Sequence, residues 1–595
     1  MTKKWLVDDA RQQYIEDAND FSRQTLDKSL LGNTIQLEMY VEIGNGISQI
    51  RLADRNKYIN NNFYDGRMQM PKMDLIMSNL TDTSIKFSEM NISITNVDGK
   101  YTKYLTDQSD YRPFINETVN LFMSINDNTR LIFSGVVKSD GGITYNKDKI
   151  EFSARDPFES LNTNLPLPTI NKTDFPNAPN ESVGKPVPFY LGDFLTNFNI
   201  EEAGAQTTSV WDGTEKIQVA CKCWKAGAGF NAGVIGYNVG GYRFVYSIGS
   251  VETTNIKFTN IQNVLIKRGE HWFETYHSLS PIYTSGFYGI DVLGFVDDAD
   301  GGLLPYIYEN GDIMIMPSKA FLTDTYTTQT ENIIYQAYIF LIAMGRLTSG
   351  NFNTANYNEA YTQLSAISSR FWAGDANINI MGYFLGLLKQ VHYDAIFANN
   401  GTVTQCLFKP LRTDSMPQIS NIAHISMKEV VDNSINIQQD IKNLFTRASG
   451  TYSFSPISGG NSLKTSTYYN NNAETKLTRV ISRIIDFPNL YVEAQVITEL
   501  QMYVRLFSAC LETITLQVSW IALSLNLGDF ITISCNYAGL QLDNVPCQIR
   551  AFAVDSSLTF VTLELLSFIN FAFPTYTPKN PTKHLSSCNQ ELLLF

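Results

Sequence analysis

Apolar and polar residues alternate with a period of two in the C-terminal part of the chain. After the apolar stretch that meets Gly528-Asp529, the alternation begins with Phe530, Ile531 and Ile533, is interrupted by a turn at 536–539, and continues through 545–554 and 559–566. Because successive side chains of a strand point to opposite faces of a sheet, this pattern predicts three consecutive strands with one buried face.

The N-terminal third shows the same alternation in short runs separated by turn residues. The runs are 34–43, 48–53, 90–95, 119–125, 131–137 and 148–156. The turn 96–99, Asn-Val-Asp-Gly, ends in Gly99, which can adopt a positive φ. Short strands at this spacing with turn signals between them are typical of a β-barrel or a β-sandwich.

Helical spacing of apolar residues predicts four helices. They are expected at 331–346, 356–371, 380–391 and 491–511. The segment 381–411 is predicted to form a helix, a strand, an Asn-Asn-Gly turn and a return strand. The most apolar run, 333–344, contains Gln336 and is too short to span a bilayer, so it indicates a buried helix.

The predicted fold class is mainly β with α+β segments, in several domains. Clustered prolines between 166 and 188 indicate a linker or an extended brace, since proline removes backbone donors and stiffens the chain. The predicted division is an N-terminal arm at 1–31, a first β-domain at 32–165, a proline-rich linker at 166–192, a β-rich insertion at 193–330, an α+β domain at 331–430, a second β-domain at 431–570 and a C-terminal arm at 571–595.

Composition and charge do not change the predicted fold class. Only 17% of the 595 residues are charged, 44% are hydrophobic, and the net charge is −13 without a basic run, which argues against a nucleic-acid-binding surface. Acidic residues follow the basic start before any long apolar run, so no signal peptide is predicted and we expect synthesis in the cytoplasm, with no membrane span.

Three groups of residues are of types that can bind a metal ion, but for each group a structural role explains the pattern more simply. Cys221 and Cys223 form a C-x-C pair without a second pair, which indicates structural cysteines. His271, Glu274 and His277 do not all share one face of a strand, which favours surface or core histidines with ordinary hydrogen-bond partners over a metal site. The acidic residues Asp297, Asp298 and Asp300 lack the spacing of an EF-hand loop and indicate an ordinary turn. No metal site and no cofactor are therefore predicted.

Catalytic signatures are also missing from the sequence. It contains no G-x-S-x-G, HExxH or C-x-x-C element, and Gly184-Lys185-Pro186 lacks the spacing of a phosphate-binding loop. The prediction is a non-enzymatic protein with no catalytic residues. An alternative stays open, because 31 Tyr and 36 Phe with frequent carboxylates also suit a β-rich carbohydrate-binding or carbohydrate-cleaving protein.

Several short motifs, in order, resemble the hub proteins of phage tail tips and baseplates. The first β-domain contains SITNVDGKY at 93–101, LIFSGVV at 131–137 and IEFSARD at 150–156. The motif GKPVPFYLGD follows at 184–193, and LNLGDFITIS lies at 525–534, after the helix, strand, turn and strand of 381–411. The resemblance covers 34–192 and 381–568, and the insertion between them is unmatched.

The resemblance implies a structural role in a virion tail. In that family, the first and later β-domains of three subunits alternate to form a pseudo-sixfold ring that continues the tail tube. It implies a homotrimer that encloses the genome-delivery channel and contacts the tail tube protein, the tape-measure protein, and distal tail, fibre or spike proteins. A related injection machine or gene-transfer particle would have the same pattern.

Three further expectations concern particular segments. Asp529 should bond local backbone donors at the start of its strand and be structural. The insertion 207–317 should lie on the outer rim, where added loops are solvated. The arms 1–31 and 571–595 should be ordered mainly by neighbouring subunits, because 592–595, Leu-Leu-Leu-Phe, is apolar.

Overall fold

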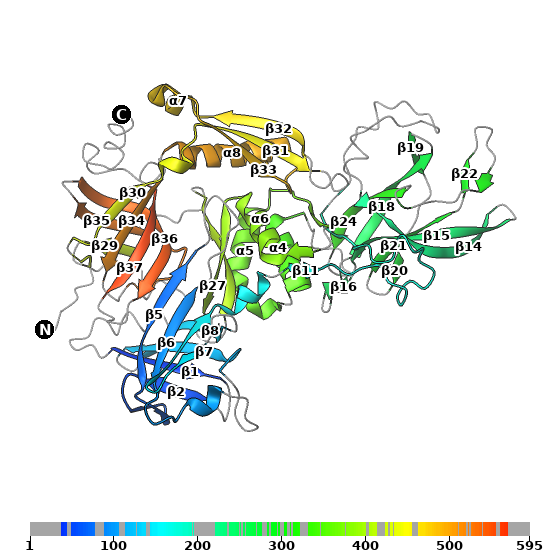
Figure 1. Ribbon diagram of the computed structural model, residues 1–595. Coiled ribbons are helices and arrows are strands. Elements are labelled where there is room, and N and C mark those ends of the chain that lie inside the picture. Colours follow the sequence, from blue (N-terminus) through cyan, green and yellow to red (C-terminus); the bar gives the residue numbers. More distant parts are fainter. Residues whose placement is uncertain are drawn as a thin grey trace.

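The computed structural model describes most of residues 37–568. The longer gaps in the described part are 78–87, 106–113, 195–220, 322–330, 413–422 and 455–461, and shorter gaps of one to six residues occur elsewhere. The described chain is mainly β, as predicted, with several sheets and few helices (Figure 1). No helix among the described residues is long and apolar enough to cross a membrane.

The N-terminal β-unit contains the strands predicted from the alternating runs. Its strands are β1 (Leu37–Ile43), β2 (Ile50–Ala53), β5 (Met68–Ile76), β6 (Glu89–Thr95), β7 (Thr118–Ile125), β8 (Asn128–Val137), β9 (Thr144–Tyr145) and β10 (Lys149–Arg155). Ile92 pairs with Phe152 in the antiparallel β6–β10 ladder, and both side chains are buried. The polar residues between the apolar ones face the other side, as a two-residue period requires.

The C-terminal β-unit is built in the same way. Its strands are β29 (Ala423–Ser426), β30 (Asn436–Gln439), β34 (Glu512–Val518), β35 (Phe530–Tyr537), β36 (Leu540–Val554) and β37 (Val561–Ser567). The three strands predicted at the end of the chain are therefore confirmed as β35, β36 and β37. Apolar side chains such as Ile533, Ile549 and Leu563 alternate into the core.

The two β-units form a single 14-stranded sheet. Strand β36 pairs with β5 in antiparallel register, from Ala551 opposite Ile76 to Val554 opposite Met73, and one hydrophobic core extends across both units. The main series of hydrogen-bonded strands runs from β2 to β30, and these two end strands do not pair with each other. The described strands form no closed barrel, so the barrel expected from the strand spacing is not confirmed.

A helical region lies beside this sheet (Figure 1). It contains α4 (Ile333–Gly345), α5 (Thr354–Gln363), α6 (Ile380–Lys389), β27 (Tyr393–Asn399) and β28 (Thr404–Pro410). Helix α6 followed by the β27–β28 hairpin is the arrangement predicted for 381–411. The predicted helix 356–371 ends earlier, at Gln363, and Phe371–Ala373 forms strand β25, which pairs with β12 (Phe189–Leu191).

The proline-rich segment is packed into the helical region. At its two ends β11 (Asn164–Pro166) pairs with β26 (Asn377–Asn379) and β12 pairs with β25. Between them, Ile170 and Val187 are fully buried in the core that contains α4 and α6. The segment thus has the character of a brace, because both of its ends are paired and its apolar side chains are buried.

A small three-stranded sheet connects the helical region with the C-terminal β-unit. It consists of β31 (Arg447–Phe454), β32 (Ser462–Tyr469) and β33 (Ser482–Phe487), with α7 (Asn471–Leu477) between β32 and β33. Helix α8 (Glu493–Ser508), predicted at 491–511, packs on it through buried residues such as Val496 and Leu500.

The insertion is β-rich, as predicted, and projects to one side of the molecule (Figure 1). Its two four-stranded sheets have the orders β13-β24-β18-β19 and β14-β15-β21-β20. Their bounds are β13 (Cys221–Lys222), β14 (Trp224–Val234), β15 (Tyr237–Ile248), β18 (Lys257–Arg268), β19 (His271–Thr275), β20 (Ile282–Thr284), β21 (Phe287–Leu293) and β24 (Ile313–Phe321). Two-stranded pairs add β16 (Ser250–Val251), β17 (Thr254–Asn255), β22 (Phe295–Asp297) and β23 (Leu303–Pro305).

Candidate functional site

A short hairpin of the N-terminal β-unit presents two aromatic rings to solvent. Strands β3 (Lys57–Ile59) and β4 (Asn62–Tyr64) are joined by Asn60 and Asn61, whose φ angles are 48° and 63°. Two consecutive positive φ angles are what a tight two-residue hairpin turn requires, and asparagine tolerates them better than most residues.

The inner side of this hairpin is fixed to the sheet. Tyr64 lies edge-on to Tyr40 of β1 with ring centroids 4.8 Å apart, and Tyr40 stacks on Phe122 of β7 at 5.1 Å. Lys57 Nζ lies 3.5 Å from a carboxylate oxygen of Glu38. This packing leaves the opposite side of the hairpin to solvent. There Tyr58 is 76% exposed and Phe63 is 45% exposed, with their ring centroids 5.3 Å apart.

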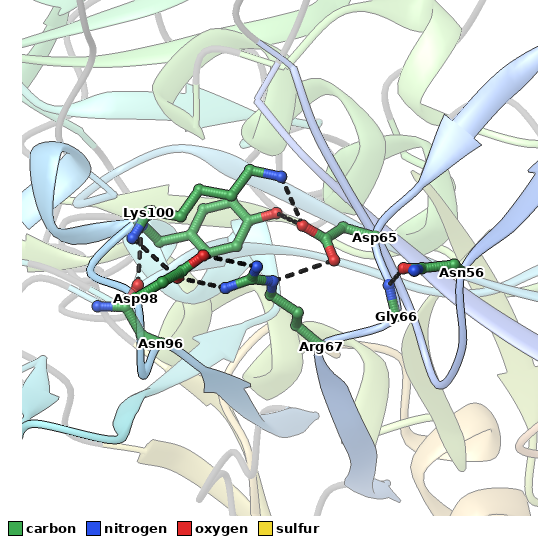
Figure 2. Close-up of polar contacts among 8 residues, drawn as sticks. Asn56, Asp65, Gly66, Arg67, Asn96, Asp98 and Lys100 are labelled. Carbon is green, nitrogen blue, oxygen red and sulfur yellow. Dashed lines mark hydrogen bonds and ion pairs between the residues drawn. The ribbon is translucent and has the colours of Figure 1, made fainter.

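A polar cluster holds the base of the hairpin, as Figure 2 shows. We call it the polar clamp; its members are Asn56, Asp65, Gly66, Arg67, Asn96, Asp98, Lys100 and Tyr101. The buried carboxylate of Asp65 accepts hydrogen bonds from Lys100 Nζ at 2.6 Å and from the Tyr101 hydroxyl at 2.9 Å. The Gly66 amide donates to Asn56 Oδ1 at 2.7 Å, which ties the two ends of the hairpin together.

Arg67 extends the polar clamp to the turn predicted at 96–99. Its guanidinium binds both carboxylate oxygens of Asp98, one of them at 2.7 Å, and also donates to Asp65 at 3.1 Å (Figure 2). Asn96 Oδ1 accepts from the Tyr101 amide at 2.8 Å. A bidentate arginine–carboxylate pair fixes both the position and the orientation of the two side chains. The turn and the hairpin are therefore held together as one unit.

The electrostatics of the polar clamp favour permanently charged carboxylates. Burial alone would raise the pKa of Asp65, but hydrogen bonds from Lys100 and Tyr101, with the charges of Lys100 and Arg67, lower it below its usual value. The hydrogen bond from Arg67 lowers the pKa of Asp98 to about 2, helped by the Lys100 amide. Acids held ionised in this way are suited to fixing a structure and poorly suited to transferring protons near neutral pH.

A second set of charges is buried where the helical region meets the C-terminal β-unit. We call it the buried charge network; its members are Lys389, His392, Asp394, Arg412, Glu499 and Arg550. Fully buried Asp394 lies 3.1 Å from Lys389 Nζ and 3.5 Å from Arg550 of β36. Burial lowers the pKa of Arg550, although the nearby Asp394 charge opposes that effect.

Helix α8 joins the buried charge network through Glu499. Arg412 Nη1 lies 2.8 and 2.9 Å from the two carboxylate oxygens of Glu499, and both side chains are buried. His392 Nε2 lies 3.1 Å from the backbone carbonyl oxygen of Glu499. The network as a whole connects α6, β27, α8 and β36 with the segments before β27 and after β28, so it fixes how these elements meet.

The glycines of two family-like motifs lie at positions that other residues would strain. Gly192 has a φ of 96°, and a Cβ there would lie 2.6 Å from the Ser369 carbonyl oxygen. Gly528 has a φ of 74°, and a Cβ there would lie 2.8 Å from Lys409 Cγ. These two motifs therefore mark sharp turns with close backbone or side-chain contacts, and not a phosphate-binding loop.

Asp529 lies where the sequence predicted. Its carboxylate accepts from the Asn526 amide at 2.9 Å, immediately before β35, which confirms the expected local backbone bond. It also pairs with Lys409 at 3.1 Å, a contact the sequence did not predict. The ion pair links the β27–β28 hairpin to the C-terminal β-unit.

Of the residues considered as metal ligands, Cys223 alone has a side chain in the part of the chain that the structure describes. Within the described residues, no three His, Cys, Asp or Glu side chains are placed to hold a metal ion. Cys223 is a buried free thiol, and burial raises its pKa. His271 and Glu274 belong to β19 and Asp297 to β22, but their side chains lie outside the described part, as do His277, Asp298 and Asp300.

The hairpin and the buried charge network were not found by sequence reasoning. The Asn60-Asn61 pair between two short aromatic runs was the available signal for the hairpin. The network had no local signal, because Lys389, Glu499 and Arg550 are far apart in the sequence and look like ordinary surface charges.

Comparison with known proteins gives structural neighbours only. No protein-family model and no curated protein matches the sequence. A 43 kDa tail protein of prophage MuSo2 from Shewanella oneidensis has a TM-score of 0.34 and 8% identity, with 89% of this chain and 98% of that chain covered. A tail protein from Neisseria meningitidis MC58 has a TM-score of 0.35 and 9% identity, with 91% and 99% covered.

A chain from the virion of a gene transfer agent particle has a TM-score of 0.37 and 9% identity, with 70% of this chain and 91% of that chain covered. At TM-scores of 0.34 to 0.37, these likenesses establish neither a common fold nor a common function.

Proposed function

We propose that this chain is a structural component of a phage tail, located in the virion, and more specifically an oligomeric hub of the tail tip or baseplate. It would form a trimeric ring that joins the tail tube to a fibre or spike and encloses the genome-delivery channel. The observation that carries the proposal is the pairing of β5 with β36, which makes one sheet of the two β-units that contain the family-like motifs.

The shared sheet supports a ring because it fixes the two β-units of one chain side by side. In the resembled family, the first and later β-domains alternate around the ring. A chain in which Phe552 of β36 lies opposite Leu75 of β5, within one hydrophobic core, presents its two units as a rigid pair. Three such pairs would supply the six units of a pseudo-sixfold ring.

The polar clusters support a mechanical role in place of catalysis. The carboxylates of Asp65, Asp394 and Glu499 each contact the positively charged side chain of a lysine or an arginine at 2.6 to 3.1 Å. Such pairs hold elements in place, and a hub must resist distortion while other tail proteins bind to it. The proposed partners are the tail tube protein, the tape-measure protein, and distal tail, fibre or spike proteins, with the insertion available on an outer side.

The mass of the purified full-length chain tests this proposal. Native mass spectrometry or mass photometry should give a species of three times the 67.0 kDa chain mass. A strictly monomeric chain that binds or cleaves a polysaccharide would instead favour the carbohydrate-binding alternative and reject the hub. Purified tail tube protein, added to the ring, should co-sediment with it.

A further inference from the structure

One face of the three-stranded sheet of β31, β32 and β33 is left uncovered by the described residues. Helix α8 packs on the other face, where a Cβ placed on Gly450 of β31 would lie 3.0 Å from Leu500 Cδ1. Because side chains alternate along a strand, Ser466 and Ile485, which pair with Gly450, also lie on the α8 side. The alternate positions form the uncovered face, which we call the hydroxyl face: Arg447, Ser449, Thr451, Thr465, Thr467, Tyr469, Ser482, Ile484 and Asp486.

The hydroxyl face is polar at its centre and open to solvent. The two outer strands, β32 and β33, expose every residue that they contribute to it, and Ile484 is 71% exposed. The hydroxyl oxygens of Ser449 and Thr467 lie 3.1 Å apart across the β31–β32 ladder, and the Thr451 hydroxyl donates to Asp486 of β33. These cross-strand contacts fix polar groups of three adjacent strands in place before any ligand binds.

Tyr469 provides an aromatic ring at one end of the hydroxyl face. The guanidinium of Arg447 lies over this ring, 5.1 Å from its centroid, and in turn donates to both carboxylate oxygens of Glu474 in α7 at 3.2 Å. These contacts hold the orientation of the ring, while the Tyr469 side chain stays 52% exposed. A ring fixed in this way can pack on an apolar C–H surface at little cost in conformational freedom.

The charges of the hydroxyl face disfavour a polyanion such as a nucleic acid. Arg447 and Asp486 are its charged residues, and the charge of Arg447 is neutralised by Glu474. Among the residues of this face, no unpaired cation is left to neutralise phosphate or sulfate groups. A ligand that matches the face is therefore uncharged.

The size and composition of the face also differ from those of a protein interface. It is roughly 10 Å wide across three strands and roughly 13 Å long over five residues of a strand, whereas a stable protein interface covers about 800 Å² on each partner. Protein interfaces are poor in serine, but Ser449 lies at the centre of this face. A small ligand rich in hydroxyl groups fits these dimensions and this chemistry better.

We propose that the hydroxyl face binds a neutral oligosaccharide. A pyranose ring presents C–H groups on its two faces and hydroxyl groups around its rim. The C–H groups would pack on Tyr469 and Ile484. The sugar hydroxyls would donate to Asp486 and exchange hydrogen bonds with Thr465 and Thr467. This binding does not depend on the proposed hub function, because a trimer and a monomer would both present the face.

Binding of the full-length chain to an array of oligosaccharides tests the proposal. The array holds neutral oligomers of glucose, galactose and N-acetylglucosamine, with sulfated and sialylated oligomers as anionic probes. We expect binding to a neutral oligomer, which Tyr469→Ala and the isosteric Thr467→Val should each weaken by about tenfold. Tyr145→Ala, at a tyrosine of the N-terminal β-unit that is 66% exposed, is the matched control and should bind like the unmodified chain.

Three results would overturn the proposal. The first is no binding to any neutral oligomer, and the second is binding that neither Tyr469→Ala nor Thr467→Val weakens. The third is binding confined to the anionic oligomers. Unchanged melting temperatures of the variants would show that the fold is retained, since all three substituted side chains are exposed. A trimer that binds no neutral oligomer would reject the sugar site and leave the hub proposal intact.

Discussion

Gly528 shows how a two-residue motif acts through backbone geometry. Its φ of 74° lets Asp529 reach the Asn526 amide, while the Lys409 side chain occupies the space where a Cβ would lie. Asp156, the last residue of IEFSARD, acts in a similar local way, since its carboxylate accepts the Phe158 amide at 2.9 Å and caps η3 (Pro157–Leu161). The motif residues thus contribute through turns and caps.

Replacing Gly528 with alanine is expected to destabilise the C-terminal β-unit. A left-handed backbone costs a non-glycine residue about 1–2 kcal/mol, and Lys409 would also have to move. Gly386 of α6 is the matched control, because a Cβ there meets nothing within 4 Å, so Gly386→Ala should stabilise its helix by about 1 kcal/mol. Thermal unfolding monitored by calorimetry measures both changes, and shifts of the same sign would contradict this account.

Asp156 should make stability depend on pH. Burial raises the pKa of Asp156 to about 7, the Glu159 charge adds to this, and the hydrogen bond from Phe158 opposes it. Because the folded pKa lies above the unfolded value of 3.8, the stabilisation is complete below pH 3.8 and is lost as pH rises through about 7.

Asp156→Asn should keep a side-chain oxygen that accepts the Phe158 amide and should remove the loss of stability at high pH. We expect the variant to be more stable than the unmodified chain at pH 8, by on the order of 2–4 kcal/mol, with little difference at pH 4. Urea unfolding of both proteins at the two pH values measures the difference. A difference that does not change with pH would show that Asp156 does not titrate in this range.

Buried charges and paired strand edges join individual elements in addition to the two apolar cores. Helices α6 and α8 and strands β27 and β36 meet at the buried charge network, where Arg412 pairs with Glu499 and Asp394 with Lys389 and Arg550. Removing one partner of a buried pair leaves the other charge without compensation, whereas removing both can be nearly neutral.

A double-mutant cycle at Arg412 and Glu499 tests this role. Arg412→Met and Glu499→Leu alone should each destabilise the protein by about 3–5 kcal/mol, and the double variant should lose much less than their sum. The exposed pair Arg55 and Glu38, at 3.0 Å, provides a control cycle with a coupling below about 1 kcal/mol. Additive losses at Arg412 and Glu499 would show that the two side chains do not stabilise each other.

The whole molecule combines a continuous sheet with projecting parts. The sheet joins the two β-units, and the insertion extends to one side (Figure 1). The β3–β4 hairpin exposes Tyr58 and Phe63. The polar clamp holds this hairpin rigid, so it can present its rings to a partner without losing much conformational freedom on binding. Exposed aromatic side chains on a rigid base are typical of protein interfaces.

Replacing Tyr58 and Phe63 with lysine is therefore expected to weaken assembly. Tyr58→Lys/Phe63→Lys should shift the mass distribution towards the monomer, or abolish co-sedimentation with the tail tube protein, while the melting temperature stays unchanged. Tyr145→Lys, at a residue that is 66% exposed, is the control. Full assembly and binding by the double variant would exclude the hairpin as an interface.

The sequence by itself determined most elements of this protein. Two-residue alternation located β6, β7, β10 and β35 to β37, and helical spacing located α4, α6 and α8, because these patterns reflect which face of each element is buried. Strand β5 was missed. It contains Pro71, and its register with β6 shifts between Gln69 and Lys72, so the strand contains an irregularity that a regular pattern does not reveal.

Only the tertiary structure decided how these elements combine. Ala551 pairs with Ile76, Leu191 with Phe371, and Arg412 with Glu499, and no local pattern links any of these partners. Such contacts depend on which edges and charges meet once the separate elements have formed. Local periodicity records that a side chain is buried, but the identity of its partner follows from the packing of the whole chain.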